Sequence, residues 1–205
     1  MTHPMLDLIV ERTSINRFDP SYTIDDATIS ELVRYASEAP SAYNFQNWRF
    51  IAVRTAAQKA RLCAMAYGQK KVEEASVTFI VCGRLKPHLD LREAWRPFVA
   101  AGHADAATLD AVVASATRGY ADNTQMQRDE AIRSASLAAM TLMLAAQAMG
   151  LVSGPMIGFD PEQVRTGFDL GPDEIPALLV TVGRPAPGNW PRKPRRPVSG
   201  VLAIV

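Results

Sequence analysis

Four short clusters of polar and aromatic residues could together bind a flat, phosphorylated ligand. The first, Arg12–Phe18 (RTSINRF), places a cation, two hydroxyls and amides after one another. Arginine offers a planar fork of donors that matches a phosphate, and serine adds a further donor. The second, Pro40–Trp48 (PSAYNFQNW), intersperses Ser41, Asn44 and Gln46 with aromatic rings. Flat apolar surfaces beside a few polar groups suit a heteroaromatic ring with polar edges.

The other two clusters lie in the second half of the chain. Residues Gly150–Asp160 (GLVSGPMIGFD) place glycines on both sides of Pro155-Met156-Ile157, so the backbone can approach a ligand closely. Residues Arg192–Pro197 (RKPRRP) hold four cations, although the formal net charge of the chain is only +1. More than one cation typically neutralises a phosphate, so this segment could complete such a site.

Each cluster taken alone also fits an ordinary structural role. The first could be a solvated, capped turn, and the second a loop anchored by its aromatic rings. The third could be a plain connection between two helices, and the fourth a solvated basic tail. These alternatives stay open as long as each cluster is considered separately.

Charge and residue usage argue against several other kinds of site. A general nucleic-acid binder is normally strongly basic, whereas this chain carries a net charge of +1. Cys63 and Cys82 form no CxxC pair, and His3, His88 and His103 are scattered, so neither a metal site nor a disulfide scaffold is expected. The N-terminal segment lacks the features of a signal peptide, which predicts a cytoplasmic protein.

The scaffold that must position these clusters is predicted as one α+β domain over residues 1–205, with a sheet flanked by helices. Strands are expected at 49–54, 77–83 and 177–183. Helices are expected at 5–12, from an N-cap at Thr23 to the residues before Pro40, and at 56–66, 70–75, 128–149 and 160–167. The apolar stretch 135–152 is expected to be a buried helix and not a membrane span.

Two segments have less regular patterns. Residues 85–124 show weak periodicity and are predicted as an insertion or lid that carries Trp95, Phe98 and Tyr120. Residues 184–205 are rich in proline and cations, and are predicted as a C-terminal tail that reaches a partner subunit.

The order and spacing of the motifs resemble the nitroreductase family along nearly the whole chain. Arg12-Thr13-Ser14 matches the family's early R-x-S segment, PSAYNFQNW matches its PSSxNxQPW loop, and Gln69–Ala75 matches its N-Q-x-x-V-x-x-A-P segment. GLVSGPMIGFDPEQVR at 150–165 matches GL-x-x-C/S-P-M-x-GFDPE-x-VR, the most specific of these motifs. Lys193-Pro194-Arg195 matches the K-x-R tail. Five motifs in the same order are hard to obtain by chance.

The resemblance implies an FMN-binding fold with a central, mostly antiparallel sheet, in a homodimer with exchanged tails and FMN at the subunit interface. The residues it assigns to the phosphate and ribityl chain are Arg12, Ser14, Lys193 and Arg195. The residues that would come from the other subunit and lie along the flavin are Pro40, Ser41, Ala42 and Asn44. Those it assigns to the pyrimidine side or ribityl hydroxyls are Gln69 and Lys71, and those over one ring face are Pro155, Met156, Ile157 and Gly158. Thr13, Asn16 and Ser134 complete the expected cofactor-binding set.

The implied activity is electron transfer from NAD(P)H through FMN to small electron-poor acceptors, such as nitroaromatics and quinones, in a ping-pong cycle. The cofactor carries this chemistry, so no catalytic side chain is expected. The alternatives are a specialised enal or semialdehyde reductase of the same superfamily, a flavin-binding protein without turnover, and a structural dimer that has lost FMN.

The chain departs from the family pattern at several positions. Asn16 stands where many members carry Lys or Arg, a charge that favours the anionic reduced flavin unless Arg17 or Lys71 replaces it. Ala42 replaces the second Ser, Asn47 replaces Pro, and Gly68 stands where Asn is common. These departures put the flavin potential and the substrate preference in question, but not FMN binding.

Overall fold

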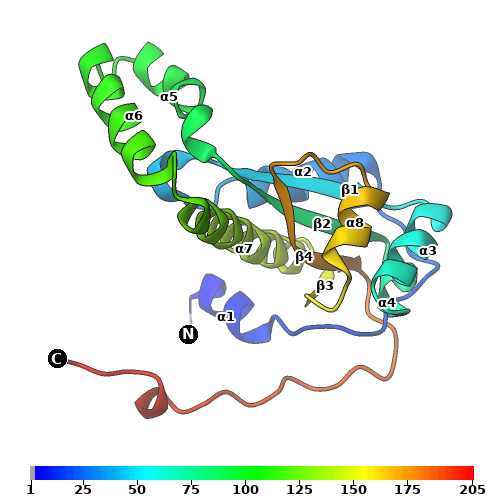
Figure 1. The fold of residues 1–205 in the computed structure, drawn as a ribbon. Helices are drawn as coiled ribbons and strands as arrows, with labels where there is room; N and C mark the ends of the chain where they lie inside the picture. The colour runs from blue at the N-terminus through cyan, green and yellow to red at the C-terminus, as the bar shows by residue number, and fades with distance from the viewer. Residues whose placement is uncertain (1–2) are drawn as a thin grey trace.

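The computed structural model describes residues 3–205 and has a four-stranded sheet at its centre (Figure 1). Its strands, in spatial order, are β1 (Trp48–Val53), β2 (Val77–Arg84), β4 (Glu174–Gly183) and β3 (Val152–Met156). All three pairings are antiparallel, and the β2–β4 pairing shifts register between Val81 and Cys82. The predicted α+β class with an antiparallel sheet is therefore confirmed.

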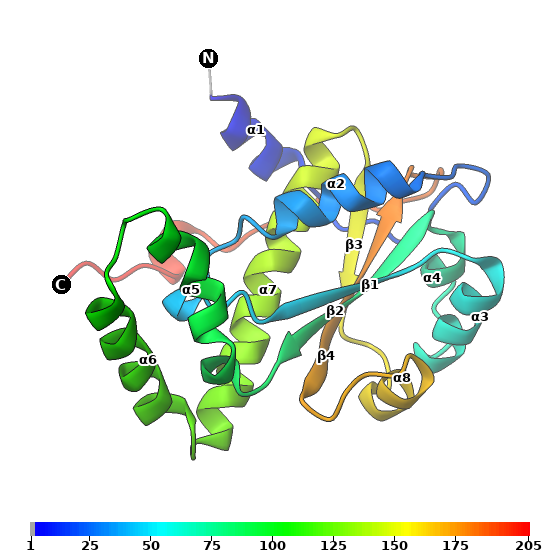
Figure 2. The ribbon, with the colours of Figure 1, turned by 90° about the horizontal axis from the view of Figure 1, so that it is seen from above.

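The central strand β2 shows that both faces of the sheet are covered. Val77, Phe79 and Val81 pack in the core on one face, whereas Ile80 and Cys82 pack in the core on the other. Alternate residues of a strand point to opposite faces, so a continuous apolar run suits a strand that is buried twice. The helices on the first face are α2 (Asp26–Ala36) and α7 (Thr124–Ala148). Those on the second face are α3 (Ala56–Met65), α4 (Lys71–Glu74) and α8 (Pro161–Gly167) (Figure 2).

Helix α7 is the core helix of this chain. A Cβ atom at Gly83 would lie 2.2 Å from the carbonyl oxygen of Ala131, so α7 crosses β2 with its backbone almost in contact. By length and composition α7 could span a membrane, but half of its most apolar window is buried inside this chain. This packing supports the interpretation of a buried helix.

The predicted lid consists of a helical hairpin that projects beyond one end of the sheet (Figures 1 and 2). Its two helices are α5 (Leu91–Ala100) and α6 (Ala106–Tyr120), preceded by the short 3₁₀ helix η2 (Pro87–Leu89). A second 3₁₀ helix, η1 (Ala42–Asn44), packs against α5. The hairpin therefore contacts the segment that contains the aromatic loop.

Both ends of the chain lie on the outside of this body. Helix α1 (Pro4–Glu11) has no buried residue, and the chain after β4 extends away from the sheet with only the 3₁₀ helix η3 (Val198–Gly200) (Figure 1). Met5, Leu6, Ile9 and Val10 of α1 are all exposed. This terminal helix therefore presents apolar side chains to solvent within this chain.

Three local predictions are wrong. The N-cap of α2 is Asp25 and not Thr23, because the Asp25 carboxylate accepts the N–H of Thr28 at 2.8 Å. Helix α2 ends at Ala36, before Pro40 can act on it. No strand was expected between 150 and 160, but β3 forms there because it pairs with β4 along its whole length.

Candidate functional site

The first and last sequence clusters meet in one cavity. This cavity has a volume of about 230 Å³, and its lining residues are Thr13, Ser14, Asn16, Trp190, Pro191, Lys193 and Arg195. Hydroxyl and amide groups come from the segment after α1, and the two cations come from the C-terminal tail. Such a mixture of cations and neutral donors suits a phosphate group.

Arg12 lies half-buried beside this cavity. Its Nη1 atom is buried and has no hydrogen-bond partner among the described residues. Burial lowers the pKa of Arg12, and the nearby charges of Arg195 and Arg192 lower it further. A buried donor without a partner, close to two other cations, is unfavourable unless an anion binds there. The three arginines therefore fit the phosphate that a cofactor such as FMN carries.

Strand β3 holds the Arg12–Ser14 segment in place. The backbone N–H of Ile15 donates to the carbonyl oxygen of Ser153 at 3.0 Å, and Ser14 forms a bridge with the same residue. A Cβ atom at Gly154 would lie 2.4 Å from the carbonyl oxygen of Ile15. Only glycine permits this approach, so the third sequence cluster positions the first.

Asn189, which the sequence analysis missed, joins the tail to the same segment. Its Oδ1 accepts the backbone N–H groups of Asn16 at 2.9 Å and of Arg17 at 3.0 Å. Its Nδ2 donates to the carbonyl oxygens of Arg17 at 2.8 Å and of Ala186 at 2.9 Å. The partners of this side chain lie up to 173 positions away, so no local pattern indicates its role.

The residues assigned to the ring's pyrimidine side also converge. Gln69 Nε2 donates to the carbonyl oxygen of Gly158 at 2.7 Å, which ties Gln69 to the loop after β3. Lys71 Nζ donates to Asn16 Oδ1 at 3.4 Å, and burial lowers the pKa of Lys71. Lys71, one of the two residues expected to replace the missing charge at position 16, therefore contacts Asn16 directly.

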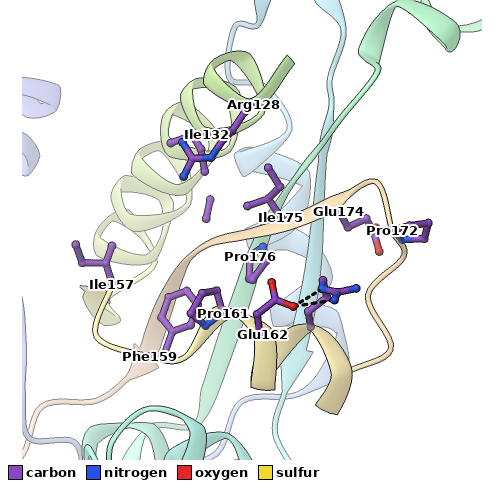
Figure 3. A pocket seen from close by; sticks show the side chains of 12 residues that line it. Arg128, Ile132, Ile157, Phe159, Pro161, Glu162, Pro172, Glu174, Ile175 and Pro176 are labelled. Carbon is purple, nitrogen blue, oxygen red and sulfur yellow. Dashed lines mark hydrogen bonds and ion pairs between the residues drawn. The ribbon is translucent and has the colours of Figure 1, made fainter. Parts of the chain in front are cut away.

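The segment Pro155–Gly158 leads into a second, larger cavity. Met156 is buried in the core, whereas the next side chain, Ile157, is 81% exposed. Ile157 borders a cavity of about 510 Å³ that lies between α7, α8 and β4 (Figure 3). Arg128 and Ile132 line it from α7, and Ile175 and Pro176 line it from β4. The sequence analysis did not identify this cavity, because its walls come from three separate elements.

The aromatic loop lies away from both cavities. None of Pro40, Ser41, Ala42 and Asn44 lines either of them in the part of the chain that the structure describes. The loop has an unusual backbone, since Tyr43, Asn44 and Gln46 have φ values of 53°, 58° and 49°. Left-handed conformations of this kind are uncommon in residues other than glycine and need support from their surroundings.

The hairpin of α5 and α6 supports this loop conformation. Trp95 Nε1 of α5 donates to the carbonyl oxygen of Tyr43 at 2.7 Å. The Tyr43 hydroxyl lies 3.2 Å from the Ser115 hydroxyl of α6. Phe45 is buried against Tyr120, with their rings edge to face at 5.1 Å. The hairpin therefore fixes the shape of the loop.

Helix α7 supports the loop from the other side through Glu130. This carboxylate is 2% exposed, forms an ion pair with Arg133 and accepts the backbone N–H of Ala42 at 3.4 Å. The Ser134 hydroxyl donates to the same carboxylate at 2.7 Å and is fully buried. Within this chain Ser134 thus holds Glu130 and has no exposed surface for a flavin contact.

Comparison with known proteins agrees with this geometry. The model of the nitroreductase family matches residues 9–184. A protein of Thermus thermophilus named NADH dehydrogenase is 34% identical over 198 residues, which are 93% of this chain and 92% of that protein. The CLA biosynthesis enone reductase of Lactiplantibacillus plantarum is 26% identical over 91% of this chain and 88% of its own length.

The fold agrees as well. A protein of Exiguobacterium sibiricum, solved in complex with FMN, superposes with a TM-score of 0.91 at 24% identity over 100% of this chain and 99% of its own. The family model covers most of the chain, including the Arg12 segment, the aromatic loop and the Gly150–Asp160 stretch. The chain therefore belongs to the nitroreductase family.

Proposed function

We propose that this protein is an FMN-dependent oxidoreductase that passes electrons from NAD(P)H to small electron-poor acceptors such as nitroaromatics and quinones. The observation that carries the proposal is the cation-lined cavity beside Arg12, where a buried guanidinium nitrogen has no partner within the described chain. Membership of the nitroreductase family and the relative named NADH dehydrogenase support the reaction class.

In this proposal Arg12, Ser14, Lys193 and Arg195 hold the phosphate and ribityl chain of FMN. Thr13 lines the same cavity and can add a hydroxyl. FMN held by these residues would supply the hydride and electron transfer between NAD(P)H and the acceptor. The protein contributes binding, orientation and electrostatics, and none of its side chains needs to act as an acid or base.

The remaining cofactor contacts are proposed for the ring. Gln69 and Lys71 would hold the pyrimidine side, where Lys71, which donates to Asn16, would supply a positive charge. Residues 155–158 would lie along one face of the ring. The hydrogen bond from Gln69 to Gly158 keeps this segment close to the pyrimidine residues.

We further propose a homodimer in which each site needs both subunits. Apolar residues are exposed on α1, at Leu137 and Met140 of α7, and at Leu202 and Ile204 of the tail, and a second copy of the chain would cover them. Pro40, Ser41, Ala42 and Asn44 would then reach the partner's flavin, since among the described residues they line neither the cavity beside Arg12 nor the cavity beside Ile157.

Mixing two defective variants tests the shared site. Arg12→Ala removes a phosphate contact, and Asn44→Ala removes a contact to the partner's flavin, so each homodimer should bind FMN weakly. A heterodimer of the two should regain one intact site, because both defects fall in the same site and the other keeps wild-type residues. If residues 40–44 served their own chain, every site would carry one defect and no binding would return.

A second candidate function is the reduction of an activated carbon–carbon double bond, as in an enal or enone. The relative named enone reductase favours it. The same residues would hold FMN for either reaction, and FMN would supply hydride transfer to such a bond as well as electron transfer to a quinone, so the two functions share the site. Steady-state rates with a panel of nitroaromatics, quinones and enals would separate them.

A further inference from the structure

The cavity beside Ile157 is lined by apolar and charged residues, and one of its charges is unpaired. Arg165 pairs with Glu162 at 2.7 Å, and Glu174 pairs with Arg49 at 2.7 Å and accepts the backbone N–H of Gly171 at 2.8 Å. The side chain of Arg128 makes no ion pair or hydrogen bond with any other residue between 3 and 205. Arg128 is thus the cavity's one charge left free for a ligand within these residues.

The apolar part of the wall suits a flat ring. Ile132 and Arg128 project from α7, across the cavity from Phe159 and Pro161 (Figure 3). Ile157 is a large apolar side chain that remains 81% exposed at its edge, and a ligand ring that covers it would remove this surface from water. The volume of about 510 Å³ lies within the usual range for sites that bind small molecules.

We infer that this cavity receives the electron acceptor, and that the preferred acceptors are flat, electron-poor molecules that carry a carboxylate. This inference rests on the proposed function, in which residues 155–158 would hold the flavin ring next to this cavity. The ring would lie against Ile157 and Ile132, and the carboxylate would pair with Arg128 through two parallel hydrogen bonds. Arg128 is then a residue that determines specificity and takes no part in the electron transfer.

Two acceptors of equal shape test the role of Arg128. 4-Nitrobenzoate and 4-nitrobenzamide differ in charge but share the electron-poor ring. In the FMN-loaded protein, Arg128→Gln should lower kcat/KM for 4-nitrobenzoate about tenfold, mainly through KM, because a hydrogen-bonded charge pair is lost. The value for 4-nitrobenzamide should stay nearly unchanged, and Arg128→Lys should restore part of the preference for the carboxylate.

The control variant is Arg34→Gln, which removes one arginine from the surface of α2, outside the cavity. It should leave both acceptors unaffected. An equal loss for both acceptors in Arg128→Gln would refute the inference. A rise in KM for NADH or NADPH with unchanged acceptor kinetics would also refute it, because the anion at Arg128 would then belong to the nucleotide.

A binding measurement separates this inference from the proposed function. Benzoate carries the carboxylate but accepts no electrons, so its dissociation constant can be measured by calorimetry on the oxidised protein. Arg128→Gln should weaken benzoate binding about tenfold, while Arg34→Gln should not. If FMN binds and NADH reduces it, but the dissociation constant of benzoate is the same in Arg128→Gln as in the unchanged protein, only the acceptor inference fails. If no FMN binds or neither nucleotide reduces it, the proposed function itself fails.

Discussion

Replacing Arg195 by alanine should separate cofactor affinity from folding stability. Arg195 lines the cavity beside Arg12, and its side chain is exposed in the absence of a ligand. Within the chain, its Nη1 donates a hydrogen bond to the carbonyl oxygen of Lys193 at 2.8 Å, on the same tail. The fold therefore depends little on this side chain, whereas the proposed phosphate site depends on it directly.

The expected magnitudes follow from these contacts. A hydrogen bond to a charged group contributes about 1.5–3 kcal/mol, so the dissociation constant for FMN should rise about 10- to 150-fold. An exposed surface substitution usually changes the free energy of unfolding by less than about 0.5 kcal/mol. Arg195 also lowers the pKa of Arg12, so its removal relieves repulsion and offsets part of any loss of stability.

Two titrations check this prediction. Quenching of FMN fluorescence by the apoprotein gives the dissociation constant, and urea denaturation of the apoprotein gives the free energy of unfolding. Arg196→Ala is the matched control, because it removes the neighbouring cation, which does not line the cavity. Equal weakening of FMN binding by both variants would show that only the overall charge of the tail matters. An unchanged dissociation constant for FMN in Arg195→Ala would show that Arg195 does not contribute to the FMN site.

Three further predictions concern the frame around the site. Gly83→Ala should destabilise the fold by about 1–3 kcal/mol in denaturant titrations, because the new Cβ would lie 2.2 Å from the Ala131 carbonyl oxygen; a change near zero would contradict the close crossing. Trp95→Phe keeps the ring but removes the hydrogen bond to Tyr43, so FMN affinity should fall a few-fold while the melting temperature changes little. Lys71→Met should lower the midpoint potential of the bound flavin, measured by dye equilibration, because it removes a half-buried positive charge that would lie beside the ring; an unchanged potential would show that Lys71 does not set the charge near the flavin.

The elements with strong periodicity could be predicted from the sequence. The apolar run of β2 could be identified because a strand buried on both faces needs apolar residues throughout. The long helix α7 could be identified from its apolar stretch, although only half of that stretch is buried within this chain. The start of α8 was also predicted correctly, since Asp160 caps it and Pro161 occupies its first turn. Strand β3 was missed because its glycine and proline disfavour a strand, and pairing with β4 overrides that preference.

The candidate site was only partly predictable. The cations and hydroxyls of the phosphate cavity were recognised because their side chains match the chemistry of the ligand. Asn189 and Glu130 were missed because they act on backbone groups that are distant in sequence. Arg128 was missed because its importance depends on which neighbouring charges are already paired, and only the three-dimensional arrangement shows this.

The measurement that tests the central claim most directly is the anaerobic absorbance spectrum of the FMN-loaded protein, recorded before and after addition of NADH or NADPH. We expect the protein to retain FMN and to be yellow. At least one nucleotide should bleach the flavin rapidly, and a quinone or a nitroaromatic compound should restore the colour. A colourless protein that FMN cannot restore, or a flavin colour that persists with both nucleotides, would contradict it.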